Sequence, residues 1–126
     1  MIQREAYKGS EFTIEWYFDE EDTSQPLEYF LALAPDRKRK VLRLFRLMAE
    51  LGILRDQTKF RFEGESVYAF KPQPDRFLCF FFKGKKIIVT NAFAKKQDKL
   101  PINEKERALR HKTDYEHRVK MRSYYV

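Results

Sequence analysis

The sequence is poor in the residues that cross-link small folds or bind metals and phosphates. It contains 1 cysteine and 4 glycines among 126 residues. The single cysteine, Cys79, cannot form a disulfide within the chain, which argues against a disulfide-stabilised secreted scaffold and fits a reducing compartment. The two histidines, His111 and His117, lie on different helical faces at their spacing, and the scattered glycines form no phosphate-binding loop. We therefore expect no metal and no cofactor.

Long apolar segments are also missing. The longest, residues 77–82, has the length of a strand and is far below the ~20 residues of a membrane-spanning helix. The N-terminus has no apolar segment followed by a cleavage site, so we expect a cytoplasmic protein. The composition, 43% hydrophobic and 16% aromatic, excludes a disordered chain. Its length favours one core, and we expect residues 1–126 to form a single domain.

Charge is abundant and unevenly distributed. Residues 1–36 hold two basic and nine acidic side chains, a net of −7, whereas residues 37–126 hold 24 basic and ten acidic ones, a net of +14. A basic region of this strength attracts a polyanion, and we expect RNA. The alternative is that the charge serves only solubility, although +14 exceeds what solubility requires.

The first half of the chain predicts a strand followed by two helices. Residues 11–18 alternate apolar and polar side chains, as a half-buried strand does. Pro26 fits the first turn of a short helix that ends near Leu33. A second helix should run from Pro35 to Leu51, with Gly52 as its C-terminal stop. Its expected core-facing stripe consists of Val41, Leu44, Phe45, Met48 and Leu51.

The second half predicts strands and a last helix. Turn glycines at Gly64 and Gly84 join the predicted strands into two antiparallel hairpins. Residues 77–82 are apolar on both faces, which predicts a central strand. A helix should follow from Pro101 to about Arg122. The four predicted strands are residues 59–63, 67–71, 76–83 and 86–92. The expected fold class is α+β: an N-terminal strand and helical hairpin, a four-stranded antiparallel sheet and a C-terminal helix.

Several short motifs give the sequence a family resemblance. The most specific is the F-x-K-K-x-x-K-x-P run from Phe93 to Pro101, which precedes a helix carrying Ala108 and the pair Asp114-Tyr115. With residues 67–71 and the Arg76-Phe77 pair, this pattern resembles the phage-derived, HigB-like branch of the RelE/ParE toxin superfamily, over about residues 12–118.

The resemblance implies a fold, an activity and partners. It implies a twisted, RelE-like sheet and the toxin of a type II toxin–antitoxin system. Such toxins are ribosome-dependent mRNA endonucleases that cleave by attack of the 2′-hydroxyl, without a metal. The implied partners are mRNA on the ribosome, with its ribosomal RNA, and a small helix-turn-helix antitoxin.

The resemblance also implies a catalytic set. Lys71 stands where the family usually has the arginine of an E-L-R strand, and Arg76 matches the arginine after the turn. These two, with the lysines of the F-x-K-K motif, would hold and neutralise the scissile phosphate. Tyr115 or His117 would move protons, although Tyr115 also falls on an apolar stripe of its helix and reads equally well as a core residue. The implied catalytic residues are Lys71, Arg76, Lys95, Lys96, Tyr115 and His117.

A second basic group surrounds the start and outer face of the helix predicted at residues 35–51. Cations at a helix N-terminus oppose the helix dipole, so a polyanion-binding surface is one explanation and a solvated face is the other. If the toxin interpretation holds, this group should dock on ribosomal RNA. The predicted RNA-binding residues are Arg37, Arg39, Lys40, Arg43 and Lys99.

Two further functions are also compatible with the sequence. One is a ParE-like gyrase inhibitor, which shares the fold without cutting RNA. The other is a catalytically weakened remnant that binds nucleic acid or an antitoxin. Lys71 supports the second alternative, because a lysine cannot grip a phosphate through two parallel hydrogen bonds as an arginine does.

Overall fold

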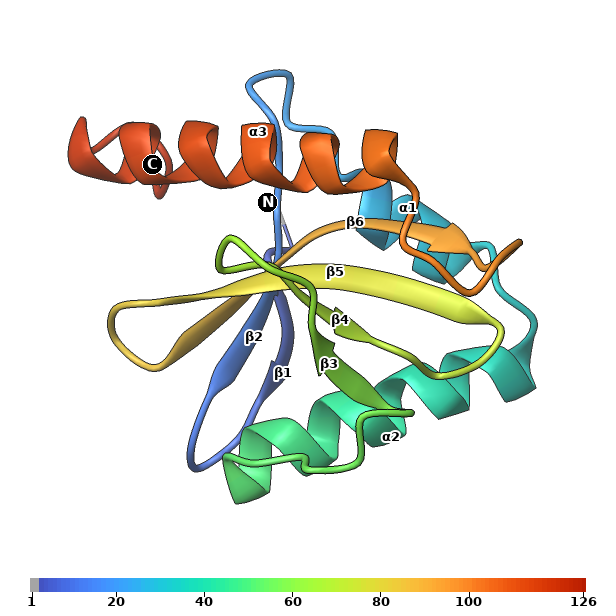
Figure 1. The fold of residues 1–126 in the computed structure, drawn as a ribbon. Helices are drawn as coiled ribbons and strands as arrows, with labels where there is room; N and C mark the ends of the chain where they lie inside the picture. The colour runs from blue at the N-terminus through green and yellow to red at the C-terminus, as the bar shows by residue number, and fades with distance from the viewer. Residues whose placement is uncertain (1–2) are drawn as a thin grey trace.

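Residues 3–126, the part of the chain that the computed structural model describes, form a six-stranded sheet and three helices (Figure 1). The sheet is twisted, so that the first two strands cross the direction of the central ones. The elements are β1 (Glu5–Lys8), β2 (Thr13–Trp16), α1 (Gln25–Leu31), α2 (Pro35–Leu51), β3 (Phe60–Phe62), β4 (Tyr68–Phe70), β5 (Asp75–Phe82), β6 (Lys86–Ala94) and α3 (Ile102–Lys120).

The strand order is β1-β2-β6-β5-β4-β3, and the sheet is mixed. The four strands β3 to β6 pair antiparallel with their neighbours, as predicted. The prediction of a four-stranded antiparallel sheet is nevertheless wrong for the whole sheet, because β2 pairs parallel with β6 and β1 pairs antiparallel with β2. A parallel partner is reached through a long crossover, which local sequence patterns do not encode.

The two helices before β3 begin and end where local chemistry predicts. The hydroxyl of Ser24 accepts a hydrogen bond from the Leu27 backbone N–H at 3.3 Å, and Pro26 lies in the first turn of α1. Gly52 ends α2 in the left-handed conformation with φ of 75°, and its N–H donates to the Met48 carbonyl at 2.8 Å. The predicted helix from Pro35 to Leu51 is confirmed.

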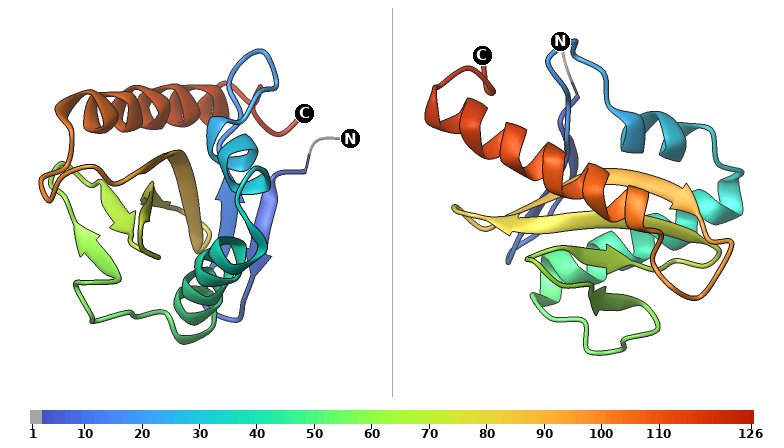
Figure 2. Two further views of the ribbon diagram at one scale, coloured as in Figure 1. Left: turned by 90° about the vertical axis from the view of Figure 1, so that its right-hand side faces the viewer. Right: turned by 45° about the horizontal axis from the view of Figure 1, so that its top comes forward.

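Helices cover both faces of the sheet (Figure 2). The α1–α2 hairpin lies on one face and α3 on the other, and β5 supplies alternate side chains to each. This double burial explains why residues 77–82 are apolar throughout, and it confirms β5 as an inner strand. The α2 side buries, among others, Trp16, Phe45, Phe70, Phe77 and Cys79, whereas the α3 side buries Leu78, Phe80, Ile88, Ala108 and Tyr115. The α+β class is confirmed.

Within residues 3–126, no helix combines the length and apolar character that a membrane crossing needs.

Candidate nucleic-acid interface

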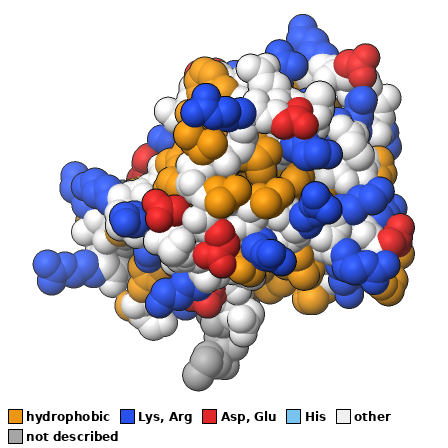
Figure 3. All heavy atoms as spheres, turned by 90° about the horizontal axis from the view of Figure 1, so that it is seen from below, with side chains coloured by type: hydrophobic (Ala, Val, Ile, Leu, Met, Phe, Trp, Pro, Cys, Tyr) orange, Lys and Arg blue, Asp and Glu red, His pale blue; other side chains and the backbone are white. Residues whose placement is uncertain are grey.

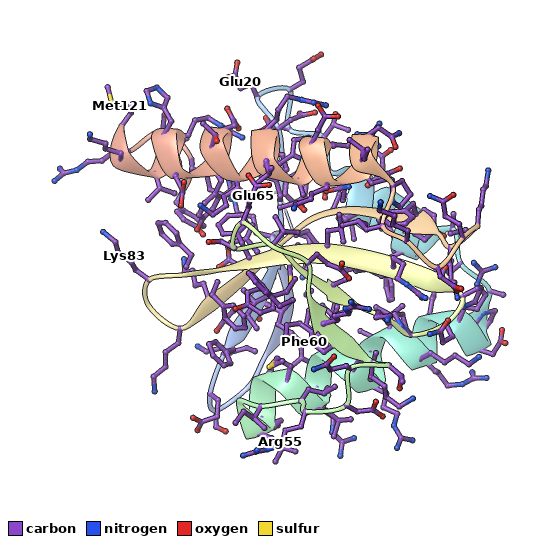
Figure 4. The ribbon with its side chains drawn as sticks, in the orientation of Figure 1. Glu20, Arg55, Phe60, Glu65, Lys83 and Met121 are labelled. Atoms are coloured by element: carbon purple, nitrogen blue, oxygen red, sulfur yellow. The ribbon has the colours of Figure 1, made fainter. Side chains whose placement is uncertain are left out.

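A basic cleft opens on the α3 face of the sheet, between the strands β3 to β5 and the segment of residues 95–101 that leads into α3. Its volume of about 130 Å³ is well above the roughly 10–15 Å³ that a cavity needs to hold one water molecule. On its outer side, the β3–β4 turn is held to α3 by an ion pair of 3.2 Å between Glu65 and Lys105 (Figure 4). The charged residues of the lining are Arg61, Glu63, Lys71, Arg76, Lys95, Lys96, Asp98 and Lys99.

Strand alternation explains why these cations share one face. Arg61, Lys71 and Arg76 each follow or precede a phenylalanine that points into the α1–α2 core, so their own side chains project to the opposite face. The three phenylalanines lie in paired register, Phe60 opposite Phe70 and Phe70 opposite Phe77. The same apolar row that anchors the sheet on α2 therefore gathers positive charge on the far side.

Arg76 supplies a fixed charge at the floor of the cleft. The residue is only 8% exposed. One terminal nitrogen of its guanidinium donates to the Asp75 carbonyl at 3.0 Å and to Oε1 of Gln73 at 3.2 Å. Burial lowers the pKa of Arg76, yet an arginine remains charged at any physiological pH. Within residues 3–126, the other two guanidinium nitrogens of Arg76 form no hydrogen bond, so they are available to an anion.

Lys71 lies close to this arginine, and neighbouring positive charges repel its ammonium group. Burial, followed by the nearby charges of Arg76 and Arg61, lowers the pKa of Lys71. Its ammonium donates to the neutral Gln57 carbonyl at 3.3 Å, and the nearby charge of Glu63 only partly offsets the effect of the cations. An anion in the cleft would relieve this repulsion.

The cleft also contains two carboxylates with different surroundings. Asp98 pairs with Lys95 at 2.9 Å, and this contact lowers the pKa of Asp98. Glu63 forms no ion pair within the described chain. It is therefore the carboxylate of the lining that remains available as a proton acceptor. The strand period could have found it, because Glu63 lies two residues after Arg61 and so on the same face.

Residues 28–113 match the family model of the phage-derived Gp49-like proteins. The chain belongs to the Gp49-like family. This family is associated with RelE-like toxins of toxin–antitoxin systems. The matched segment contains the whole lining of the cleft. No curated protein matches the chain.

Most of the cations predicted from sequence converge in this Gp49-like fold. Five of them line the cleft, although they come from the position after β4, from β5 and from the segment before α3: Lys71, Arg76, Lys95, Lys96 and Lys99. Sequence reasoning missed the two flanking side chains on β3 and its end, Arg61 and Glu63.

Tyr115 is not brought to the cleft. It is fully buried under α3, its ring packs edge-on against Phe80 and Phe82, and its hydroxyl lies 2.5 Å from that of Tyr125. Burial keeps the Tyr115 hydroxyl away from solvent. It also raises the pKa of Tyr115, which makes the phenol a weaker proton donor. The apolar stripe thus predicted its buried environment correctly, and Tyr115 is not among the residues that line the cleft.

His117 also lies elsewhere. It is exposed near the C-terminal end of α3, where it lines a shallow depression with Arg110 and Asp114. The cleft adjoins the other end of this helix, roughly 20 Å away along the axis. The expected role of His117 in proton transfer is therefore not supported by its position. His111 is packed against Tyr17 at 4.5 Å between ring centroids, and burial lowers its pKa.

The basic residues of α2 divide into two groups. The guanidinium of Arg37 forms an ion pair with the buried carboxylate of Asp75, and its Nε donates to Oδ2 at 3.0 Å. With 35% of its side chain exposed, Arg37 forms this ion pair on one side, and its contact with RNA stays a prediction. Arg39, Lys40 and Arg43 are exposed. Figure 3 views the side on which α2 lies and shows Lys and Arg side chains around a central apolar area.

Within the described residues, no group of three or more His, Cys, Asp or Glu side chains is placed to hold a metal ion.

Proposed function

We propose that this Gp49-like protein is the toxin of a type II toxin–antitoxin system and cleaves mRNA on the ribosome. The observation that carries the proposal is the convergence of Arg61, Lys71, Arg76, Lys95 and Lys96 on one small cleft. Preorganised cations of this kind stabilise the charge that develops on a phosphate during phosphoryl transfer. The family association with RelE-like toxins supports the same reading.

The proposed reaction uses the nucleophile that RNA itself carries. The 2′-oxygen attacks the adjacent phosphorus, the bond from phosphorus to the 5′-oxygen breaks, and a 2′,3′-cyclic phosphate remains. Glu63 would accept the 2′-hydroxyl proton, because it is the cleft carboxylate without an ion pair in the described chain. Lys71 would donate a proton to the leaving 5′-oxygen, since its lowered pKa makes it a stronger acid. Arg76 would neutralise the phosphorane.

Binding would extend beyond the cleft. Lys99, at its rim, would contact the RNA backbone, and the exposed Arg39, Lys40 and Arg43 of α2 would dock on ribosomal RNA. The proposed protein partner is a small helix-turn-helix antitoxin, and the proposed location is the cytoplasm.

The first prediction tests cleavage directly. Inducing the chain in cells should produce breaks in translated messages, mapped by primer extension, and should stop growth. Arg76→Ala should reduce cleavage at least about 100-fold, because it removes the fixed charge at the phosphate. Arg55→Ala is the matched control, since this exposed arginine lies beside the end of α2, away from α3 (Figure 4), and should leave cleavage unchanged. Intact messages in cells that contain the wild-type chain would contradict the proposal.

One observation favours a second function. The cleft lining contains neither histidine nor tyrosine within the described chain, and Lys71 replaces a bidentate arginine. A protein that binds RNA without cutting it accounts for both facts. It predicts that purified protein retains RNA affinity, and loses it in Arg76→Ala, while messages stay whole. DNA damage with continuing translation would instead indicate gyrase inhibition.

A further inference from the structure

Asp75 is a buried carboxylate that joins three elements. It begins β5, is 1% exposed and accepts hydrogen bonds from α1 and α2. The Tyr29 hydroxyl donates to its Oδ1 at 2.5 Å. The Arg37 guanidinium donates to both oxygens, at 2.5 Å and 3.0 Å. Because both oxygens are held from two directions, the carboxylate has a single orientation.

This fixed residue lies directly beside the floor of the cleft. Asp75 and Arg76 are consecutive in β5, so their side chains point to opposite faces of the sheet. The Arg76 guanidinium returns to donate to the Asp75 carbonyl at 3.0 Å. The turn before them also anchors the other wall, since the Lys95 N–H donates to the Pro74 carbonyl at 2.8 Å. The backbone around Asp75 thus supports both sides of the cleft.

We infer that Asp75 is a positioning residue for Arg76, with Tyr29 and Arg37 as its supports. The two helices hold the carboxylate on one face of the sheet, and the Asp75 carbonyl thereby holds the guanidinium on the other. The consequence for RNA rests on the proposed function, whereas the consequence for the order of the Arg76 side chain does not. The α1–α2 hairpin accordingly acts on the cleft without lining it.

A second constellation of the same chemistry provides an internal control. The Tyr17 hydroxyl donates to Asp114 at 2.5 Å, and Nε of Arg118 donates to the same carboxylate at 2.9 Å. It joins the end of β2 to α3, and none of its members lines the cleft. Tyr29→Phe and Tyr17→Phe each remove one hydroxyl that donates to a carboxylate. The two variants therefore differ in whether that carboxylate adjoins Arg76.

The second prediction measures the mobility of the Arg76 side chain in the free protein. NMR relaxation of its Nε–Hε group should show a rigid side chain in the wild type. Tyr29→Phe and Asp75→Asn should both make it more mobile, whereas Tyr17→Phe should not. Tyr29→Phe keeps the Arg37 ion pair and so remains informative if Asp75→Asn fails to fold. An equally rigid Arg76 in Tyr29→Phe would overturn the inference, as would equal loosening by Tyr17→Phe.

RNA binding gives the second readout, with a short single-stranded oligoribonucleotide as the probe. Tyr29→Phe should weaken binding about threefold to tenfold in the wild-type background and hardly at all in the Arg76→Ala background, because positioning acts only through that arginine. Equal losses in both backgrounds would overturn it. If the wild type binds no RNA, the proposed function fails, and the NMR measurement alone decides whether Asp75 positions Arg76.

Discussion

Lys71 shows how a single cleft residue opposes folding. Its pKa is lowered by burial and by neighbouring cations, so the folded protein holds this proton more weakly than the unfolded chain does. The loss of folding stability caused by the charged Lys71 side chain is therefore fully present at neutral pH. The free energy of unfolding should increase as the pH rises through the lowered pKa of Lys71 in the folded state. The increase should level off above the pKa of lysine in the unfolded chain, near 10.4.

The third prediction follows from this penalty. Lys71→Met should raise the Tm by about 2 °C at pH 7 and low salt, because it removes one of the repelling charges. The same change should weaken RNA binding. Thermal unfolding across pH 7 to 10 is the measurement, and the gain should shrink as pH rises. Lys120→Met, at the exposed end of α3, is the control. An unchanged or lower Tm in Lys71→Met would contradict the argument.

Residue identity and residue position were predictable to different degrees. The cleft lysines and Arg76 could be predicted from short motifs, because consecutive strands and a short loop keep them close together. Tyr115 could not be assigned from its motif position alone, because the helical period sends its side chain into the core. Arg37 looked like its exposed neighbours in sequence, and its buried partner Asp75 is far along the chain.

The turn between β1 and β2 is pressed against the end of α2. A Cβ atom on Gly9 would lie 2.4 Å from the carbonyl oxygen of Ala49. That carbonyl accepts hydrogen bonds from the N–H groups of Glu11 and Phe12, at 2.8 Å and 3.0 Å. The turn thus completes the C-terminal end of the helix, where carbonyls lack intrahelical partners.

The fourth prediction concerns this contact. Gly9→Ala should lower the free energy of unfolding by about 1–3 kcal/mol, because the backbone of α2 cannot yield as a flexible side chain would. Chemical denaturation measures the loss, and the amide protons of Glu11 and Phe12 should exchange faster. Gly84→Ala is the control: no atom lies within 4 Å, so only its positive φ of +80° opposes the change, at about 1 kcal/mol. Unaltered exchange at Glu11 and Phe12 in Gly9→Ala would contradict the contact.

Most elements could be predicted because their signals are local. The helix from Pro35 to Leu51 has a proline start and a glycine stop, and the structure has the same bounds. Four of the five residues predicted for its core-facing stripe are buried, but Leu51 is 67% exposed, and Ala49 is buried in its place. Strand β1 was missed because Glu5–Lys8 is short and only its two middle residues are partly buried. The place of β2 beside β6 depends on the crossover, which no local signal determines.

Across the whole molecule, the net charge of +7 conceals an acidic and a basic part. The cleft and α2 belong to the basic part of the chain, so RNA would meet a surface far more positive than the total suggests. Binding through such a surface releases counterions and must depend strongly on salt.

The fifth prediction is the size of that dependence. If about five cleft cations each neutralise a phosphate, the affinity for single-stranded RNA should fall with a log–log salt slope of about −3.5. Lys99→Ala should reduce the magnitude of the slope by about 0.7. Lys83→Ala, in the exposed β5–β6 turn (Figure 4), should leave it unchanged. Fluorescence titration at several salt concentrations measures both. Equal changes in the two variants would show that the whole surface, not the cleft, binds RNA.

The parallel pairing of β2 with β6 also determines when the sheet can form during translation. Thr13 lies opposite Lys86, so the early hairpin leaves the ribosome long before the strand that completes it. Until then one edge of β2 presents unpaired backbone groups, and the sheet cannot close. The walls of the cleft, from Arg61 to Pro101, are made in the same late interval. A nascent chain can therefore assemble the sheet and the cleft only after β6 and the segment of residues 95–101 have been made.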